Sequence, residues 1–398
     1  MSENKVKKED VCKIKVALIF LNRSGGTLKC SVLLAESLSE MAELKAFVSS
    51  DADCDILKNR ACFTKVTTGT GRANNFLNTI NPLNYYRIIQ KIKSFDPDVI
   101  HFPIEHVWNS VLFLALKKYP VVQTIHDPVR HSGEGNLFYD YLRHLAIQRA
   151  DRIIVLSKQF ERSFERFGIK SDDIDVIPHG SFAFDREISE PPLKRQVLFA
   201  GRINKYKGLD VLLKAFAIMQ HSIPGASLII AGKGDVEPYR HLLDKVNNVT
   251  LINRYVTEEE LRELHSDCDF VVVPYIDASQ SGVIAVAAAN GRAVISSDVG
   301  GLSEQIVDGK TGFLVEKSNP QILADKIMTL LNNDNLILTM GKNARQFFRE
   351  KYCWEVISRR TKETCTKSIE NHRANSRKNR LILLLSAGKN LVVEKLSK

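Results

Sequence analysis

A short basic loop follows an apolar run and is bounded by two glycines, Gly201 and Gly208. Within this loop, Arg202 and Lys207 stand five residues apart. A guanidinium fork and a lysine ammonium at this spacing can converge on one diphosphate. They would neutralise the negative charge on a departing nucleotide diphosphate, a task that otherwise needs a metal ion. The alternative interpretation is a pair of solvated loop cations with no ligand.

Two further turns are rich in small residues, and each also follows an apolar run. The first, ASQSG at residues 278–282, leads into small apolar residues that indicate a helix ending near Gly291. Backbone N–H groups at the start of such a helix can bind an anion. The second turn, DVGGLSE at residues 298–304, is predicted to open another helix. The alternative for both turns is an ordinary strand-to-helix connection.

The N-terminal half contains weaker candidates of the same kind. Gly25 and Gly26 lie between an apolar run and a segment with helical spacing, which is a geometry that lets a phosphate approach the backbone. His126 ends the apolar run 121–125 and is followed by Asp127. Open α/β sheets bind ligands at the carboxyl ends of their strands, so His126 is a site candidate. His101 ends an earlier run, and for either histidine a purely structural role is the alternative.

These candidates need a scaffold that brings strand ends together, and the periodicity predicts one. Short apolar runs alternate with helix-like segments in both halves of the chain. In the first half they are 13–21, 44–48, 99–102, 121–125, 150–157 and 174–177, with a helix at 80–95. In the second half they are 196–200, 228–231, 249–252, 270–273 and 293–295, and Thr257 with Glu260 forms a capping box.

The segment 181–195 lacks periodicity and contains two consecutive prolines, so we place a domain junction there. We therefore predict an α/β protein with two Rossmann-like domains facing each other across a cleft. The expected boundaries are residues 1–185 for the N-terminal Rossmann-like domain and 186–355 for the C-terminal Rossmann-like domain. Residues 356–398 are expected to form a C-terminal helix and a basic tail.

Composition agrees with a soluble protein that has large cores. The chain has 398 residues, of which 44% are hydrophobic, enough for two domains. Its seven cysteines are scattered and include no C-x-x-C pair, which favours reduced thiols in the cytoplasm over disulfides or a zinc site. The polar start does not resemble a signal peptide, and no stretch reaches the length of a membrane span. We expect a cytoplasmic protein without a metal.

Positive charge is concentrated at the C-terminus. Residues 367–398 carry eight Lys or Arg against two Glu, which is +6 of the total net charge of +10. With the apolar run 381–385, this tail is suited to an anionic membrane, which would place the protein peripherally on the inner face of the cell membrane. The alternative is a solvated helix packed on the body by its leucines. Nucleic acid is disfavoured because aromatic residues are not interleaved with the cations.

Several of these segments together resemble one enzyme family. GRINKYKGLDVLLKAF is similar to the G-R-x-x-x-x-K-G motif of family-four retaining glycosyltransferases. VGGLSEQIVDGKTGFLV resembles the G-G-x-x-E-x-x-x-x-G-x-x-G-x-L-V segment of that family. TIHDP, ADRIIVLS, DVIPHG and IIAGKGD occur at matching places and in matching order. The resemblance covers residues 13 to 354 approximately and leaves the two ends outside.

The resemblance implies a GT-B enzyme that moves a sugar from a nucleotide-sugar to a sugar or lipid-linked acceptor with retention of configuration. The products would be surface polysaccharides, glycolipids or glycoprotein glycans, and no cofactor or metal is required. By position, Arg202 and Lys207 would hold the diphosphate, and His126 would lie over the sugar. The residues implied around the donor are Gly25, Gly26, Gly201, Gln280, Ser281, Gly282, Val283 and Glu304.

One departure from the family pattern concerns the donor. The family commonly carries E-x7-E, but Ala278 and Val286 occupy the two glutamate positions here. The second glutamate normally holds the nucleotide ribose, so this contact is in doubt. Some family members have the S-Q-S-G-V variant that this chain resembles at residues 279–283, so we expect a variant donor site. The alternative is a non-catalytic subunit or scaffold of the same fold, and a nucleotide-sugar epimerase is a weaker one.

Overall fold

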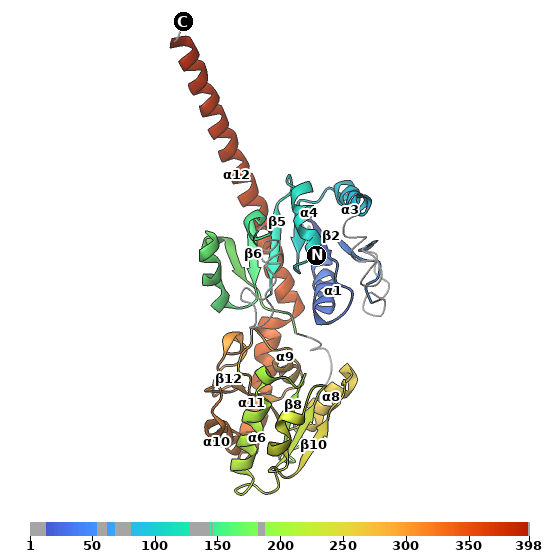
Figure 1. Ribbon diagram of the computed structural model, residues 1–398, viewed down its shortest axis with the longest axis vertical. Helices are drawn as coiled ribbons and strands as arrows, with labels where there is room; N and C mark the ends of the chain where they lie inside the picture. Colours follow the sequence, from blue (N-terminus) through green and yellow to red (C-terminus); the bar gives the residue numbers. More distant parts are fainter. Residues whose placement is uncertain are drawn as a thin grey trace, which may run out of the picture. The chain divides into compact units, whose positions relative to one another are not determined.

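The chain forms two compact units in the computed structural model (Figure 1). The structure describes residues 13–53, 62–67, 81–126, 144, 146–181 and 188–396, with side chains up to residue 375 except that of residue 166. The first unit comprises Met1–Val155, Glu161–Ile177 and Ser358–Lys398, and the second comprises Leu156–Phe160 and Pro178–Ile357. The C-terminal segment, which we listed separately as a helix and basic tail, thus falls within the first unit.

The first unit is built on a sheet of seven parallel strands in the order β3-β2-β1-β4-β5-β6-β7. The strands are β1 Lys15–Phe20, β2 Glu43–Ser49, β3 Phe63–Val66, β4 Val99–Phe102, β5 Val121–Ile125, β6 Arg152–Val155 and β7 Ile174–Val176. Its helices are α1 Gly26–Ser39, α3 Pro82–Phe95 and α4 Val107–Ala115, with 3-10 helices at Lys158–Phe167 and Ser171–Asp173.

The second unit has a sheet of six parallel strands in the order β10-β9-β8-β11-β12-β13. The strands are β8 Gln196–Ala200, β9 Ser227–Ala231, β10 Val249–Ile252, β11 Phe270–Val273, β12 Ala293–Ser297 and β13 Gly312–Val315. The helices are α6 Leu209–Met219, α7 Arg240–Leu243, α8 Glu258–Asp267, α9 Gly282–Ala289, α10 Pro320–Leu331 and α11 Asp334–Tyr352. Shorter 3-10 helices lie at Lys205–Lys207, Glu237–Tyr239 and Gly300–Leu302.

The expected strands and the two-domain α/β class are confirmed, and so is the capping box of α8 at Thr257 and Glu260. One expectation is wrong. The glycine turn at residues 298–304 does not open an α-helix but forms only the 3-10 turn Gly300–Leu302. Two strands, β3 and β13, were not predicted; in β3 only Val66 is fully buried, so its sequence carries little apolar signal.

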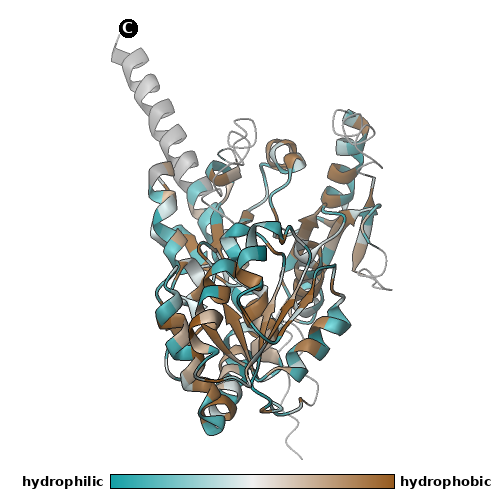
Figure 2. Ribbon diagram, turned by 60° about the horizontal axis from the view of Figure 1, so that its bottom comes forward, coloured by the Kyte–Doolittle hydropathy of each residue, from teal (hydrophilic) through white to brown (hydrophobic). Residues whose placement is uncertain are grey.

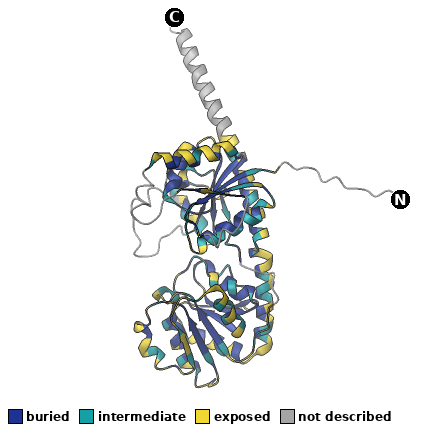
Figure 3. Cartoon of the chain, turned by 90° about the vertical axis from the view of Figure 1, so that its right-hand side faces the viewer, coloured by how far each residue is buried: buried dark blue, intermediate teal, exposed yellow. Residues whose placement is uncertain are grey.

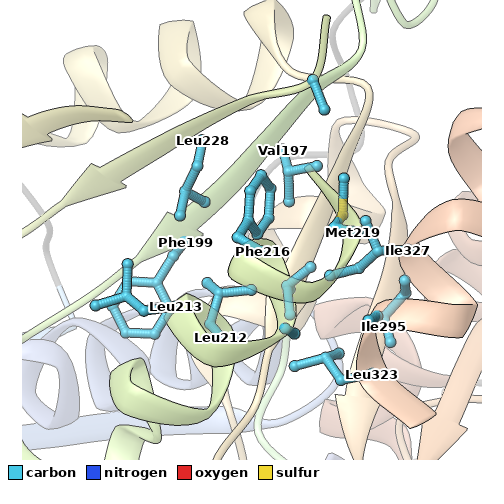
Figure 4. Packing of buried hydrophobic residues seen from close by; sticks show 14 of the residues in the cluster. Val197, Phe199, Leu212, Leu213, Phe216, Met219, Leu228, Ile295, Leu323 and Ile327 are labelled. Carbon is cyan, nitrogen blue, oxygen red and sulfur yellow. The ribbon is translucent and has the colours of Figure 1, made fainter. Parts of the chain in front are cut away.

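Burial explains why the strands read as continuous apolar runs. Helices cover both faces of a parallel sheet, so strand side chains on either face are buried. Figures 2 and 3 show strands that are largely apolar and buried, with polar and exposed residues on the outer sides of the helices. In the second unit, the α6 residues Leu212 and Phe216 pack on Val197 and Phe199 of β8 (Figure 4). This packing fixes β8, from which the basic loop departs.

The long helix α12, Trp354–Leu396, ends the chain and continues from the second unit into the first. Lys367 Nζ lies 3.2 Å from a carboxylate oxygen of Asp175, and His372 Nδ1 lies 3.0 Å from one of Asp151. These contacts attach the first-unit part of α12 to β7 and to the residue before β6. The leucine run 381–385 and the basic residues from 377 onward lie outside the residues whose side chains the structure describes.

Candidate functional site

The order of the strands in the second unit places two of the candidate loops side by side. The chain begins this sheet at β8, builds outward to β10 and then returns to add β11 on the other side of β8. Ligands of open α/β sheets bind at the carboxyl ends of the strands where the order reverses in this way. The basic loop Gly201–Gly208 follows β8, and the turn at 278–282 follows β11, so both lie at the point of reversal.

Lys207 is the most unusual charged side chain at this point. Its Nζ lies 3.7 Å from the centre of the Tyr275 ring and 5.0 Å from that of Tyr206. It forms no ion pair with any described carboxylate. Burial, followed by the nearby charge of Arg202, lowers the pKa of Lys207 to about 7. A cation that is desolvated and lacks a counter-ion fits a site that is completed by an anionic ligand.

Backbone contacts hold Lys207 in this place. Gly208 adopts a φ of 65°, and a Cβ there would lie 1.9 Å from the Pro274 carbonyl oxygen. The N–H of Ile276 donates to the Tyr206 carbonyl at 2.8 Å. The basic loop is therefore pressed against the segment that leaves β11, and a side chain at position 208 would separate the two.

Arg202 lies at the other end of the loop and is exposed. It makes no hydrogen bond or ion pair with the described residues, although its charge acts on Lys207. Gly201 approaches the start of α9, where the position of its missing Cβ is 3.8 Å from the side chain of Val283. The structure thus brings Gly201 close to the start of α9 and Arg202 within electrostatic reach of Lys207, and a ligand shared by these groups stays a prediction.

The start of α9 offers backbone N–H groups, but fewer than expected. Gly282 and Val283 begin the helix, so their N–H groups have no carbonyl partner within it. The N–H of Ser281 is instead donated to Gln305 Oε1 at 2.9 Å, and Gln305 Nε2 donates back to the Ser281 carbonyl at 3.2 Å. Because Gln305 is buried, this pair of bonds fixes the turn. The Ser281 N–H is therefore not available to a ligand, and ligand contacts with the N–H groups of Gly282 and Val283 stay predictions.

The glycine pair of the second turn has a packing role. A Cβ on Gly300 would lie 1.7 Å from the Ala278 carbonyl oxygen, and one on Gly301 would lie 2.0 Å from that of Ser279. Only glycine therefore allows residues 300–301 to pack directly on the first turn. This segment therefore supports the 278–282 turn and does not open the helix that we expected.

Two other implied donor contacts are already engaged by the protein. The amide of Gln280 donates to the Leu156 carbonyl and accepts from the His179 N–H at 3.4 Å. Glu304 Oε1 accepts from Ser157 Oγ at 2.6 Å and from the Lys158 N–H at 2.8 Å. These bonds join the segments 156–160 and 178–181 to the rest of the second unit. Gln280 and Glu304 position these segments, and a direct contact to a ligand stays a prediction for both.

In the first unit, the order of the strands reverses between β1 and β4. Gly25 and Gly26 follow β1 and begin α1. Apart from their chain neighbours and the backbone of α1 itself, no atom of the described residues lies within 4 Å of a Cβ built on either glycine. This space is open to a ligand at the helix start. His126 follows β5, one strand further along, and its Nε2 donates to the Pro103 carbonyl at 2.8 Å. Asp127, which we grouped with His126, lies outside the described residues.

His101 has a structural role. Its side chain is 1% exposed, and its Nε2 lies 2.9 Å from Thr124 Oγ1 on the neighbouring strand. Burial lowers the pKa of His101 to about 3, which keeps the ring neutral. A neutral, enclosed ring inside β4 cannot reach a ligand. The structural alternative is therefore the right one for this histidine.

The geometry supports the binding of an anion with two phosphate groups in the second unit. Two cations and two helix N–H groups follow the carboxyl ends of the neighbouring strands β8 and β11. The described residues contain no group of three or more His, Cys, Asp or Glu that could hold a metal. Sequence reasoning missed Tyr275 and Gln305. Tyr275 follows a buried strand and one proline, and this position at a strand end could have identified it. Nothing in the sequence near Gln305 indicates that it bonds Ser281.

Two family models match consecutive parts of the chain. The model described as Glycosyltransferase Family 4 matches residues 34–181, and that described as Glycosyl transferases group 1 matches residues 181–347. An uncharacterized glycosyltransferase of Methanocaldococcus jannaschii is 29% identical over 286 residues, which span 69% of this chain and 76% of the relative. D-inositol 3-phosphate glycosyltransferase of Corynebacterium glutamicum is 28% identical over 57% of this chain and 58% of its own length.

Solved structures share the fold. The Anabaena protein HepE in complex with UDP superimposes with a TM-score of 0.70 at 19% identity, covering 89% of this chain and 99% of HepE. Sucrose-phosphate synthase of Thermosynechococcus elongatus gives a TM-score of 0.67 at 21% identity, covering 88% and 98% of the two chains. Both are similar to this chain in architecture, with two Rossmann-like domains. Among the described residues, no helix is both long and apolar enough to cross a membrane.

Proposed function

The chain belongs to the group 1, family-four glycosyltransferases of GT-B fold, and from this premise we propose that it transfers a sugar from a nucleoside-diphosphate sugar with retention of anomeric configuration. The acceptor we propose is the hydroxyl of a sugar or of a lipid-linked sugar. The enzyme would thus act in the synthesis of a surface polysaccharide, a glycolipid or a glycoprotein glycan.

The observation that carries the proposal is the environment of Lys207. Its ammonium lies over the Tyr275 ring, is largely removed from water and has no described carboxylate beside it. Such a cation is costly to bury unless a ligand supplies the negative charge. Arg202 and the N–H groups of Gly282 and Val283 surround the same strand ends, and together they suit the two phosphate groups of a nucleoside diphosphate.

In the proposed reaction, the bond between the anomeric carbon and the diphosphate oxygen breaks, and a bond from the acceptor oxygen to that carbon forms. The electron pair of the broken bond stays on the diphosphate, where Arg202 and Lys207 stabilise the added charge. The acceptor proton passes to the departing phosphate oxygen, so no strong protein base is required. The role we propose for His126 is to contact the sugar.

A UDP-sugar is the donor class we would test first, because HepE has been crystallised with UDP and with UDP-glucose. Binding of UDP, GDP and ADP can be compared by thermal shift, since a ligand that binds only the folded state raises the melting temperature. We expect one nucleotide to raise it for the wild type and not for Arg202→Ala. Lys205→Ala is the matched control, because Lys205 is an exposed cation of the same loop.

The outcomes separate the donor site from the fold. A shift that persists in Lys205→Ala and disappears in Arg202→Ala supports the diphosphate assignment. An equal rise in melting temperature in all three proteins would show that the nucleotide binds outside this loop. If none of the three nucleotides shifts the wild type, the replacement of both E-x7-E carboxylates by Ala278 and Val286 has removed donor binding, and the proposal fails.

A further inference from the structure

Two neighbouring helices of the first unit, α3 and α4 (Figure 1), have exposed apolar side chains in addition to those that they bury in the core. They pack against each other through the rings of Tyr85 and Trp108, whose centres are 4.3 Å apart. The inner face of α3 contributes Ile88 and Ile92 to the core, and α4 contributes Leu112. The inner faces of both helices are therefore buried in the core. The exposed apolar side chains lie on their outer faces.

Four large apolar side chains of these two helices face the solvent. Leu83 and Tyr86 on α3 are 59% and 60% exposed, and Val111 and Leu114 on α4 are 40% and 64% exposed. Within the described part of the first unit, no other large hydrophobic side chain is exposed to this extent. Their spacing of three residues places each pair on one side of its helix. We call these four residues the outer apolar face.

The charges around the outer apolar face are mainly positive, and the acidic residues next to these helices in the sequence are Asp96, the C-cap of α3, and Glu105 before α4. Neither α3 nor α4 contains an aspartate or glutamate. The surrounding cations are Arg87, Lys91 and Lys93 on α3 and Lys117 and Lys118 directly after α4. Lys118 pairs with Asp96 at 3.2 Å, but Arg87, Lys93 and Lys117 pair with no described carboxylate. An apolar surface with unpaired cations around it is complementary to a surface that is apolar inside and anionic outside.

We propose that the outer apolar face docks the first unit on an anionic lipid bilayer. The aliphatic and aromatic side chains would enter the boundary between headgroups and acyl chains, and the cations would contact the anionic headgroups. Tyr86 suits this boundary because its ring is apolar and its hydroxyl is polar. The inference stands apart from the proposed sugar transfer, since it concerns surface chemistry alone.

The charge pattern favours lipid over a second copy of the chain. A symmetric contact between two such faces would bring Arg87, Lys93 and Lys117 of one copy toward the same cations of the other, and like charges repel. The C-terminal tail is a separate membrane candidate. Its contribution can be removed by ending the chain at residue 376, which leaves α3 and α4 intact.

The test is co-sedimentation of the full chain with vesicles of phosphatidylcholine alone or with roughly one third phosphatidylglycerol. Each cation at an anionic surface contributes about a fivefold gain in affinity, so Arg87→Gln with Lys117→Gln should weaken binding roughly 25-fold. Leu83→Gln with Leu114→Gln should weaken it about tenfold or more. The matched controls are Lys245→Gln with Lys310→Gln for charge, and Ile218→Gln for an exposed apolar residue of the second unit.

The proposal is supported if both α3–α4 double variants lose binding to the anionic vesicles. The control variants and the chain ending at residue 376 should keep that binding. Wild type that fails to bind these vesicles overturns it. So does binding that depends on residues 377–398 and not on the two helices. Sedimentation velocity gives a further check, because a dimer that becomes monomeric in Leu83→Gln with Leu114→Gln would assign the face to a second copy.

Discussion

Lys207 and Tyr275 form a cation–π pair that joins the loop after β8 to the segment after β11, with 3.7 Å between the lysine nitrogen and the ring centre. Burial raises the pKa of Tyr275 above its usual range, so the hydroxyl stays neutral and supplies no counter-charge. Tyr275 therefore positions the ammonium without neutralising it. The pair leaves Lys207 ready to accept an anionic partner from solution.

This pair predicts that nucleotide binding is linked to proton uptake. With a pKa of about 7, Lys207 is charged below that pH and becomes neutral as the pH rises through it. A bound diphosphate favours the charged form and raises the pKa again. Above pH 7, binding should therefore take up as much as about one proton, and affinity should fall as the pH rises. Calorimetry in two buffers of different ionisation enthalpy measures the uptake directly.

Lys207→Arg provides the control for proton uptake. Arginine stays charged throughout this pH range, so the variant should bind without taking up the proton, although its geometry differs from that of lysine. Uptake of the same size in this variant would place the proton on another group. Uptake absent from the wild type would mean that Lys207 is already charged in the free protein.

Arg202 and Lys207 should both be needed for the transfer step. Removing either cation leaves charge on the departing diphosphate unstabilised, so Arg202→Ala and Lys207→Ala should each lower kcat/KM on the order of 10²–10³-fold. Steady-state rates with the donor identified by thermal shift measure the loss. Lys205→Ala, in the same loop, should retain nearly full activity. Normal turnover by a variant lacking both cations would contradict their assignment.

Gln305 should act on donor binding through the turn that it holds. Gln305→Leu removes both bonds to Ser281 and leaves a buried N–H without a partner, which typically costs about 1–3 kcal/mol. We expect a donor KM raised about tenfold, with a smaller change in kcat, because the N–H groups of α9 lose their orientation. Gln321→Leu on α10 is the control, since Gln321 is exposed and bonds only Asp325 among described residues. Equal effects of the two substitutions would exclude this role.

The strands could be predicted because both faces of a parallel sheet are buried, which makes runs such as Phe270–Val273 continuously apolar. The strands that were missed lack this signal. In β3, Phe63, Thr64 and Lys65 are not fully buried, and β13 begins with a glycine. The helix expected after residue 298 was wrong because the sequence pattern is ambiguous. A pair of glycines is typical of a turn that opens a helix, but Gly300 and Gly301 instead allow close backbone packing.

The site was predictable only to the level of single loops. Arg202 and Lys207 stood out by type and spacing, but the proximity of Gly201, which opens their loop, to Val283 depends on β8 and β11 being neighbours in the sheet. Strand order follows from how the whole chain packs, and local sequence does not encode it. For the same reason Gln305 could not be linked to Ser281 from the sequence, although the structure joins the two residues by two hydrogen bonds.

Arg292, which lies between α9 and β12, joins several segments of the second unit. Its side chain is fully buried and donates to backbone carbonyls at the ends of two helices. The distances are 2.7 Å to the His265 carbonyl, 2.8 Å to that of Ser266 and 2.9 Å to that of Asn290. A third segment joins through the Ser189 carbonyl at 2.9 Å. A cation suits this place because helix C-termini carry partial negative charge.

Arg292→Met should therefore destabilise the second unit without affecting the donor site directly. The variant leaves several buried carbonyls without a donor and should lower the free energy of unfolding by about 3 kcal/mol, measured by urea unfolding. Arg292→Lys should recover only part of the loss, since an ammonium cannot reproduce the planar fork that reaches three segments. Arg240→Met, which removes an exposed ion pair with Glu237, should change stability by less than about 1 kcal/mol. Wild-type stability in Arg292→Met would show that water can replace the guanidinium, and that segment 188–190 is held by other contacts.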